Sequence, residues 1–150
     1  MFLFRIFRIK NFVLTVFAVG TCLLLALGVR VTNCVRLHNI EGERTFYLDS
    51  VSSQGLMRSE ISARDLSRIV GESVRFDLAD ESETEVLARI QEEYGAKVLF
   101  VERAGGVSSY YCHTDEWENG IILNGELVNL HIAVSETQCS VGTPIIFGGF

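Results

Sequence analysis

The strongest constraint on this chain is a run of nineteen residues, 11–29, that carries no charge between Lys10 and Arg30. At about 1.5 Å per helical residue, such a run crosses the hydrocarbon core of a bilayer, which is about 30 Å thick. The run is apolar on every side, whereas a helix that packs on a soluble core has a polar stripe. We therefore expect residues 11–29 to form a transmembrane anchor.

Basic residues flank this segment on both sides. Three precede it and two follow it: Arg5, Arg8, Lys10, Arg30 and Arg36. The positive-inside rule favours a cytoplasmic tail over residues 1–10, and no second span follows, so the rest of a single-pass cell-membrane protein is expected outside the cytoplasm. The alternative is a secreted protein, released by cleavage of a signal peptide near Gly28. The apolar run exceeds the usual signal-peptide length of about 7–15 residues, which favours the anchor.

The remainder of the chain is strongly acidic. Residues 38–150 hold eight basic residues and all nineteen acidic residues, which gives a net charge of −11. A field of this sign repels phosphate groups, so we expect no nucleic-acid partner. The membrane, reached through residues 11–29, is the one partner that composition predicts directly.

Alternation of apolar and polar residues predicts a domain rich in strands over 45–150, joined to the anchor by a polar tether over 30–44. Asn124-Gly125 is a strong signal for a two-residue hairpin turn. The expected strands are 45–52, 74–78, 97–103, 107–113, 121–123 and 126–135, with shorter strand-like pieces at 139–141 and 145–147.

Two helices are expected in the same domain. One covers residues 62–70. The other covers 82–94, where Ser82-Glu-Thr-Glu85 is a capping box and Gly95 follows the last turn. Strands that follow one another through short turns pair as antiparallel neighbours, and each has one apolar face for a helix to cover. The expected fold class is α+β: a curved antiparallel sheet with one or two helices packed on one face, plus the N-terminal transmembrane helix.

Cysteine usage depends on the expected topology. Cys22 lies in the anchor, whereas Cys34, Cys112 and Cys139 would face an oxidising compartment. Three such residues make one disulfide and one spare thiol. Cys112 and Cys139 both lie on expected strands, so we predict that they form the pair, and the state of Cys34 stays open.

A thiol-dependent envelope enzyme is the catalytic alternative. A nucleophilic cysteine needs a base, and the candidate set is Cys112 or Cys139 with His131. Motifs of serine hydrolases, zinc proteases and phosphate-binding loops are absent from the sequence. No C-x-x-C pair is present, and the acidic loop 115–119 does not follow the EF-hand pattern, so we expect neither a metal nor a cofactor.

Several side chains are candidates for a binding surface. Trp117 is the only tryptophan and lies among acidic residues, either tucked under its loop or offered as an anchor to a partner. Tyr110 and Tyr111 are adjacent on a strand, so one of them faces outward. In strand 126–135, alternation puts Asn129 and His131 on the polar face. We therefore predict a binding surface that includes Trp117, Tyr111, Asn129 and His131.

The C-terminal stretch carries a resemblance. Val128-Asn-Leu-His-Ile-Ala-Val134, followed by Val141-Gly-Thr-Pro-Ile-Ile146, resembles the closing segment of YwmB-like proteins. These are secreted or anchored proteins of endospore-forming Firmicutes with a fold likened to that of the TATA-binding protein. The resemblance implies a link to sporulation and provides no catalytic residues. The expected function is a non-enzymatic, membrane-anchored interaction module of the cell envelope, with a protein partner there.

Overall fold

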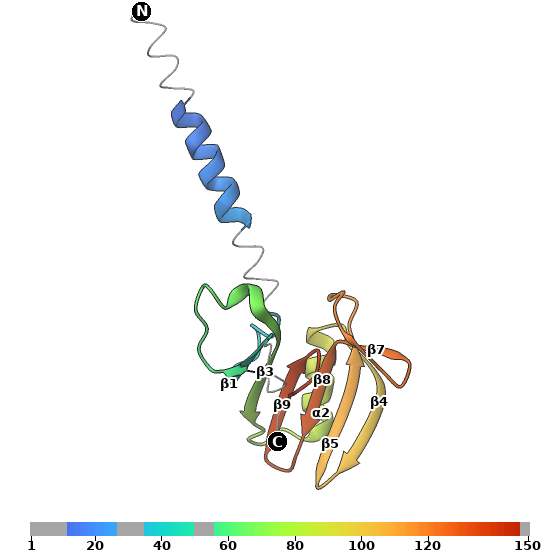
Figure 1. Cartoon of the computed structure of the whole chain (residues 1–150). Helices are drawn as coiled ribbons and strands as arrows, with labels where there is room; N and C mark the ends of the chain where they lie inside the picture. The colour runs from blue at the N-terminus through green and yellow to red at the C-terminus, as the bar shows by residue number, and fades with distance from the viewer. Residues whose placement is uncertain (1–11, 27–34, 50–55, 148–150) are drawn as a thin grey trace, which may run out of the picture. The chain divides into compact units, whose positions relative to one another are not determined.

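The computed structural model of this chain describes residues 12–26, 35–49 and 56–147 (Figure 1). It divides into two units between Cys34 and Val35, and each is described by itself. Several expectations lie outside the described residues: the basic tail 1–10, the first part of the tether, the cleavage position at Gly28, and Cys34.

Residues 12–26 form a helix, within the segment that was expected to be the anchor. Its large apolar side chains are exposed along its length, by 60% to 76% at Phe12, Leu14, Phe17, Leu23, Leu24 and Leu25. Within the described residues, no helix is long and apolar enough to cross a membrane. Residues 11 and 27–29 of the expected span lie outside the description.

The second unit, residues 35–150, is built on a seven-stranded antiparallel sheet in the order β2-β1-β3-β9-β8-β5-β4. Two further strands, β6 and β7, form a separate hairpin. The strands are β1 Glu43–Leu48, β2 Leu56–Arg58, β3 Ile69–Asp77, β4 Lys97–Ala104, β5 Val107–His113, β6 Ile121–Leu123, β7 Glu126–Val128, β8 Leu130–Val134 and β9 Gln138–Thr143. The expected Asn124-Gly125 turn is confirmed, with both residues at positive φ.

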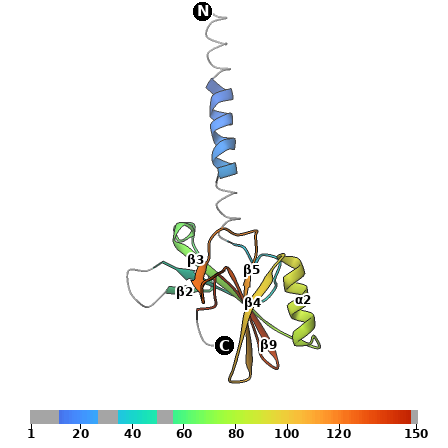
Figure 2. The same cartoon turned by 90° about the vertical axis from the view of Figure 1, so that its right-hand side faces the viewer.

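One helix, α2 at Glu83–Glu93, packs on one face of the sheet (Figure 2). Its capping box is confirmed, because the Ser82 hydroxyl accepts from the Glu85 amide and the Glu85 carboxylate accepts from the Ser82 amide. Val86 and Ile90 are buried in the core that the sheet supplies from β3, β5, β8 and β9. The α+β class and the large antiparallel sheet are therefore confirmed.

The helix expected over 62–70 is wrong. Only a single 3-10 turn forms there, at Leu66–Arg68, and β3 begins immediately at Ile69. Gly71, which directly follows the expected helix in a position where glycine often ends a helix, pairs with Tyr47 inside the sheet. A Cβ at this position would lie 2.4 Å from the Thr143 carbonyl oxygen. The glycine therefore serves close strand packing instead of a helix end.

The compact unit begins earlier than expected. Residues 35–44 were predicted to be tether, yet Leu37 is fully buried and Ile40 is 6% exposed, both in the core. The carboxylate of Glu72, itself 1% exposed, accepts hydrogen bonds from the Arg36 and Leu37 amides and pairs with Arg44. This buried carboxylate fastens the first residues of the unit to β3.

The strand expected over 126–135 is interrupted at Asn129. Its side-chain amide accepts a hydrogen bond from the Thr114 amide and donates to the Thr114 and Trp117 carbonyls, each at 2.8 Å. The chain changes partners at this point, because β7 pairs with β6 whereas β8 pairs with β5 and β9. Asn129 is therefore fully buried and secures the loop that follows β5.

Candidate ligand-binding groove

Strand register places two rows of side chains on the sheet face opposite α2. From β1 to β4, one row runs through Thr45, Ser73, Gly142, His131, Tyr111 and Phe100. The neighbouring row runs through Glu43, Arg75, Ser140, Ala133, Ser109 and Glu102. The second row has charged residues at both ends and small side chains in the middle. This pattern leaves a trough across the strands.

Two hollows lie over this trough. The first, of about 230 Å³, reaches from β1 and β2 to β9. The second, of about 180 Å³, reaches from β3 to β5. Arg75 and Ser140 line both hollows, so the two hollows adjoin at these residues. We call the two adjoining hollows the cross-strand groove, and its polar lining consists of Glu43, Thr45, Ser73, Arg75, Ser135, Gln138 and Ser140.

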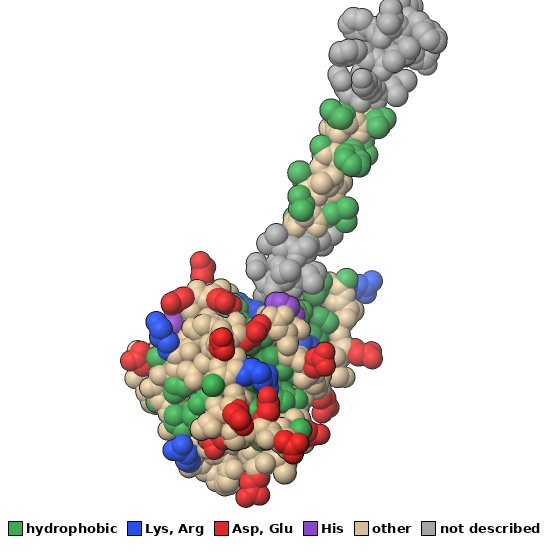
Figure 3. All heavy atoms as spheres, turned by 180° about the vertical axis from the view of Figure 1, so that it is seen from behind, with side chains coloured by type: hydrophobic (Ala, Val, Ile, Leu, Met, Phe, Trp, Pro, Cys, Tyr) green, Lys and Arg blue, Asp and Glu red, His purple; other side chains and the backbone are tan. Residues whose placement is uncertain are grey.

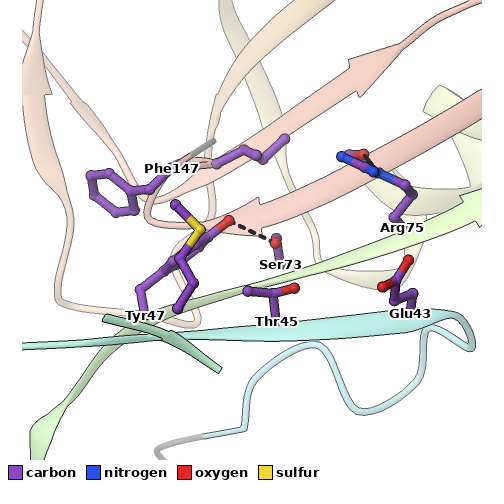
Figure 4. Close-up of a pocket in the computed structure, with 9 residues that line it drawn as sticks. Glu43, Thr45, Tyr47, Ser73, Arg75 and Phe147 are labelled. Carbon is purple, nitrogen blue, oxygen red and sulfur yellow. Dashed lines mark hydrogen bonds between the residues drawn. The ribbon is translucent and has the colours of Figure 1, made fainter. Parts of the chain in front are cut away.

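Hydrogen bonds hold the polar side chains of the groove in place (Figure 4). The hydroxyls of Tyr47 and Ser73 lie 2.7 Å apart, and Arg75 Nε donates to Ser140 Oγ at 3.5 Å. Glu43 lies directly across the β1–β3 pair from Arg75. The groove thus combines hydroxyls with one guanidinium and one carboxylate.

The C-terminal segment, residues 144–147, forms an apolar wall of the groove. Ile146 and Phe147 line the first hollow, and the Phe147 ring meets Tyr47 edge to face at 5.1 Å between centroids. The Ile146 amide donates to His131 Nδ1 at 3.3 Å. A Cβ on Gly142 would approach Ile146 Cγ1 to 2.6 Å, so glycine there allows the segment to lie close to the sheet.

Two of the predicted binding residues come together beside this wall. The Tyr111 ring stacks on the His131 ring at 4.5 Å, and Phe100 stacks on the other side of Tyr111. His131 is 4% exposed, and burial lowers the pKa of its imidazole to about 4. Alternation predicted His131 on the polar face of its strand, and it does lie on the face opposite the core residues Leu130 and Ile132. The C-terminal segment and the aromatic stack cover this part of the face, so the imidazole is buried.

Trp117 and Asn129 lie away from the groove. The Trp117 ring packs against the core and lies 5.4 Å from the Tyr94 ring, with the Arg36 guanidinium 5.5 Å from its centroid. Asn129 is buried at the end of β7. The structure therefore does not bring the four predicted residues into a single surface.

The disulfide predicted between Cys112 and Cys139 is also wrong, because both residues are free buried thiols. Cys112 lies on β5 opposite Leu130, and Cys139 lies on β9 opposite Val134, so β8 separates them. Two strand spacings amount to about 9.6 Å, beyond the roughly 7 Å between Cα atoms that a bridge tolerates. Both thiols point into the core between the sheet and α2.

The same arrangement separates the cysteines from their candidate base. His131 faces the side of the sheet opposite both thiols, because it alternates with Leu130 and Ile132 of the core. Burial raises the pKa of Cys112 and of Cys139 to about 12. A thiolate paired with an imidazolium, which thiol catalysis requires, does not form from these residues.

We predict that Cys112 and Cys139 react with a maleimide at least about 10³-fold more slowly in the native protein than in denaturant, because exposure requires unfolding. Mass spectrometry after timed labelling at pH 8 resolves each cysteine, and the same two cysteines labelled in denaturant provide the reference rate. Resistance that persists in denaturant until a reductant is added would contradict the structure, since the two residues would then be bonded.

Sequence reasoning missed the polar lining of the groove. In the expected strand 74–78, Val74, Phe76 and Leu78 form one apolar face. Ser73 and Arg75 lie in the opposite phase of the same alternation. The same signal is present in β9, where Ser140 alternates with Cys139 and Val141.

Comparison with known protein families, with curated proteins and with solved structures finds no match to this chain.

Proposed function

We propose that this chain is a membrane-anchored, non-catalytic binding domain of the cell envelope, with the cross-strand groove as its binding surface. The observation that carries the anchor is the uncharged run 11–29, of which residues 12–26 are helical with large apolar side chains exposed. Exposed apolar surface on this scale is costly in water and stable in lipid. The domain faces the extracytoplasmic side, with a binding partner in the envelope.

The groove supports a binding role better than a catalytic one. Its two hollows, of about 230 Å³ and 180 Å³, are each smaller than a typical drug-sized ligand site, and they adjoin at Arg75 and Ser140, so they offer neighbouring subsites on one face. Acidic side chains are spread over the face of the domain in Figure 3 and do not gather at one place. This distribution disfavours nucleic acid and anionic lipid as partners of the domain.

The thiol-enzyme alternative has less support. Its cysteines are buried, carry a pKa of about 12 and face away from His131. A role in sporulation and kinship with YwmB-like proteins stay predictions of the C-terminal resemblance.

Membrane fractionation tests the anchor. We expect the full chain to remain in the membrane pellet after carbonate extraction. Val19→Arg combined with Leu23→Arg should move it to the soluble fraction, because each arginine near the bilayer centre costs about 2.5–3.5 kcal/mol. Ile122→Arg is the matched control, since Ile122 is 67% exposed on the second unit and should not affect fractionation.

Reporter fusions after Phe150 test the orientation. A reporter that is active only outside the cytoplasm should be active, and one that is active only in the cytoplasm should be silent. The opposite pattern would overturn the proposed location. N-terminal sequencing of the protein recovered from both the membrane and the soluble fractions separates an anchor from a signal peptide, because cleavage near Gly28 would remove the apolar run and release the rest of the chain.

A further inference from the structure

We propose that the cross-strand groove binds a neutral oligosaccharide. This inference rests on the proposed function, because it supplies the ligand class of that binding domain. The groove crosses the strands from β1 to β5. With neighbouring strands about 4.8 Å apart, these four spacings amount to about 19 Å. Such a groove is elongated enough for a chain of linked rings.

Hydroxyls dominate the polar lining. Thr45, Ser73, Ser135 and Ser140 each contribute one, and Gln138 adds an amide. A hydroxyl donates one hydrogen bond and accepts others, and an amide also does both. Ser73 is bonded to Tyr47, Ser135 to the Gln138 backbone and Ser140 to Arg75, and each of these oxygens keeps a lone pair that can accept from a sugar hydroxyl.

Charge in the groove favours a neutral ligand. Arg75 is at the junction of the two hollows, with Glu43 across from it on β1. An anion beside Arg75 would also face Glu43, within a domain of strongly negative net charge. A cation beside Glu43 would face Arg75. Neutral hydroxyls, in contrast, accept from the guanidinium and donate to the carboxylate.

One wall of the groove suits the apolar faces of sugar rings. Tyr47, Met57, Ile146 and Phe147 line the first hollow together with Thr45 and Ser73. Phe147 is 41% exposed and Met57 is 53% exposed, so both present apolar surface to a ligand. Tyr47 combines an apolar ring with a hydroxyl that reaches Ser73. A pyranose ring, with C–H groups on its faces and hydroxyls at its edge, matches this division.

Other ligand classes fit less well. An extended peptide usually pairs its backbone with a sheet edge, whereas the groove lies on a sheet face and runs across the strands. A lipid chain would place apolar surface against Thr45, Ser73 and Arg75, which would then lose their contacts with water. The oligosaccharide satisfies the polar lining and the apolar wall together.

The test is ligand-observed NMR on the full chain in lipid nanodiscs, which avoids sugar-based detergents. The probes are the neutral tetrasaccharides cellotetraose, maltotetraose, chitotetraose and mannotetraose, with an oligogalacturonate as the anionic probe and tetraglycine as the peptide probe. We expect at least one neutral tetrasaccharide to bind, and the anionic and peptide probes to bind at least tenfold more weakly. Preference for either of these two probes, or no binding of any neutral sugar, would overturn the inference.

Matched variants locate the site. Thr45→Val keeps the shape and removes a hydroxyl, so affinity should fall about fivefold, and Arg75→Gln should lower it at least tenfold. Thr137→Val and Arg103→Gln change exposed residues outside the groove and should leave affinity unchanged. Equal effects of groove and control variants would also overturn the inference. The fractionation and reporter experiments do not depend on sugar binding. If the domain is anchored as proposed but binds no sugar, only the proposed ligand class is refuted, and the proposed anchor and orientation stand.

Discussion

Replacing Glu72 with alanine is expected to lower the free energy of unfolding by about 3–5 kcal/mol, the usual cost of breaking a buried ion pair from one side. The Glu72 carboxylate is 1% exposed, bonds to the Leu37 amide at 2.8 Å and to the Arg36 amide, and lies 2.7 Å from Arg44. Its removal leaves the Arg44 guanidinium, 22% exposed, without its counter-charge and leaves two amide donors without an acceptor.

Glu81 provides the matched control. It pairs with Arg89 at 2.7 Å, but the two side chains are 43% and 47% exposed. Glu81→Ala should therefore cost no more than about 1 kcal/mol, as exposed ion pairs do. Denaturant unfolding of the full-length protein measures both variants. A Glu72→Ala cost that does not exceed the Glu81→Ala cost would contradict the role assigned to the buried carboxylate.

The contacts of Glu72 also predict which part of the domain loses its structure first in the Glu72→Ala variant. The Arg44 guanidinium donates to the Leu37 and Ile40 carbonyls, so the ion pair and the first turn of the unit form a single network. Loss of Glu72 should expose the peptide bond after Arg36 to trypsin before the rest of the domain unfolds. Digestion at Arg36 in Glu72→Ala, and not in Glu81→Ala, is the local signature that accompanies the loss of stability.

Elements with local signals could be predicted from the sequence. The capping box that starts at Ser82, the glycine at 95 and the turn at Asn124 each act within a few residues, and the structure contains all three. The β4–β5 hairpin formed within one residue of its expected bounds for the same reason. These features need no knowledge of the rest of the fold.

Features that depend on distant partners could not be predicted. Glu72 meets Leu37 across 35 residues, and Ile146 meets His131 across 15. The order of the strands decides such contacts, and alternation within one strand does not reveal its neighbours. The predicted disulfide failed for this reason, since β8 lies between Cys112 and Cys139.

The cross-strand groove combines features that could be predicted from local sequence with features that depend on distant parts of the chain. The polar phase of β3 and β9 is visible in the sequence, so the presence of Ser73, Arg75 and Ser140 on one face was predictable. Whether that face is covered is a tertiary property. The C-terminal segment covers it at His131 and leaves it open at Arg75, so residues of similar polarity have different surroundings.

His131 should make the stability of the domain depend on pH in a defined direction. Its pKa is about 4 in the folded protein, against about 6.5 for an unperturbed histidine. Between these values the unfolded chain binds the additional proton, so stability is complete above about pH 6.5 and decreases as the pH falls towards 4. A shift of this size corresponds to about 3 kcal/mol.

The comparison with His131→Gln isolates this contribution. Glutamine can accept from the Ile146 amide but does not titrate, so the variant should lose about 3 kcal/mol less stability than wild type between pH 7 and pH 4. His38→Gln replaces an exposed histidine and should retain the pH dependence of wild type. NMR titration provides a direct reading, because the His131 ring signals should not shift between pH 7.5 and 5. A midpoint near 6.5 for those signals would show that the imidazole is in contact with water, and would remove the basis for the C-terminal wall of the groove.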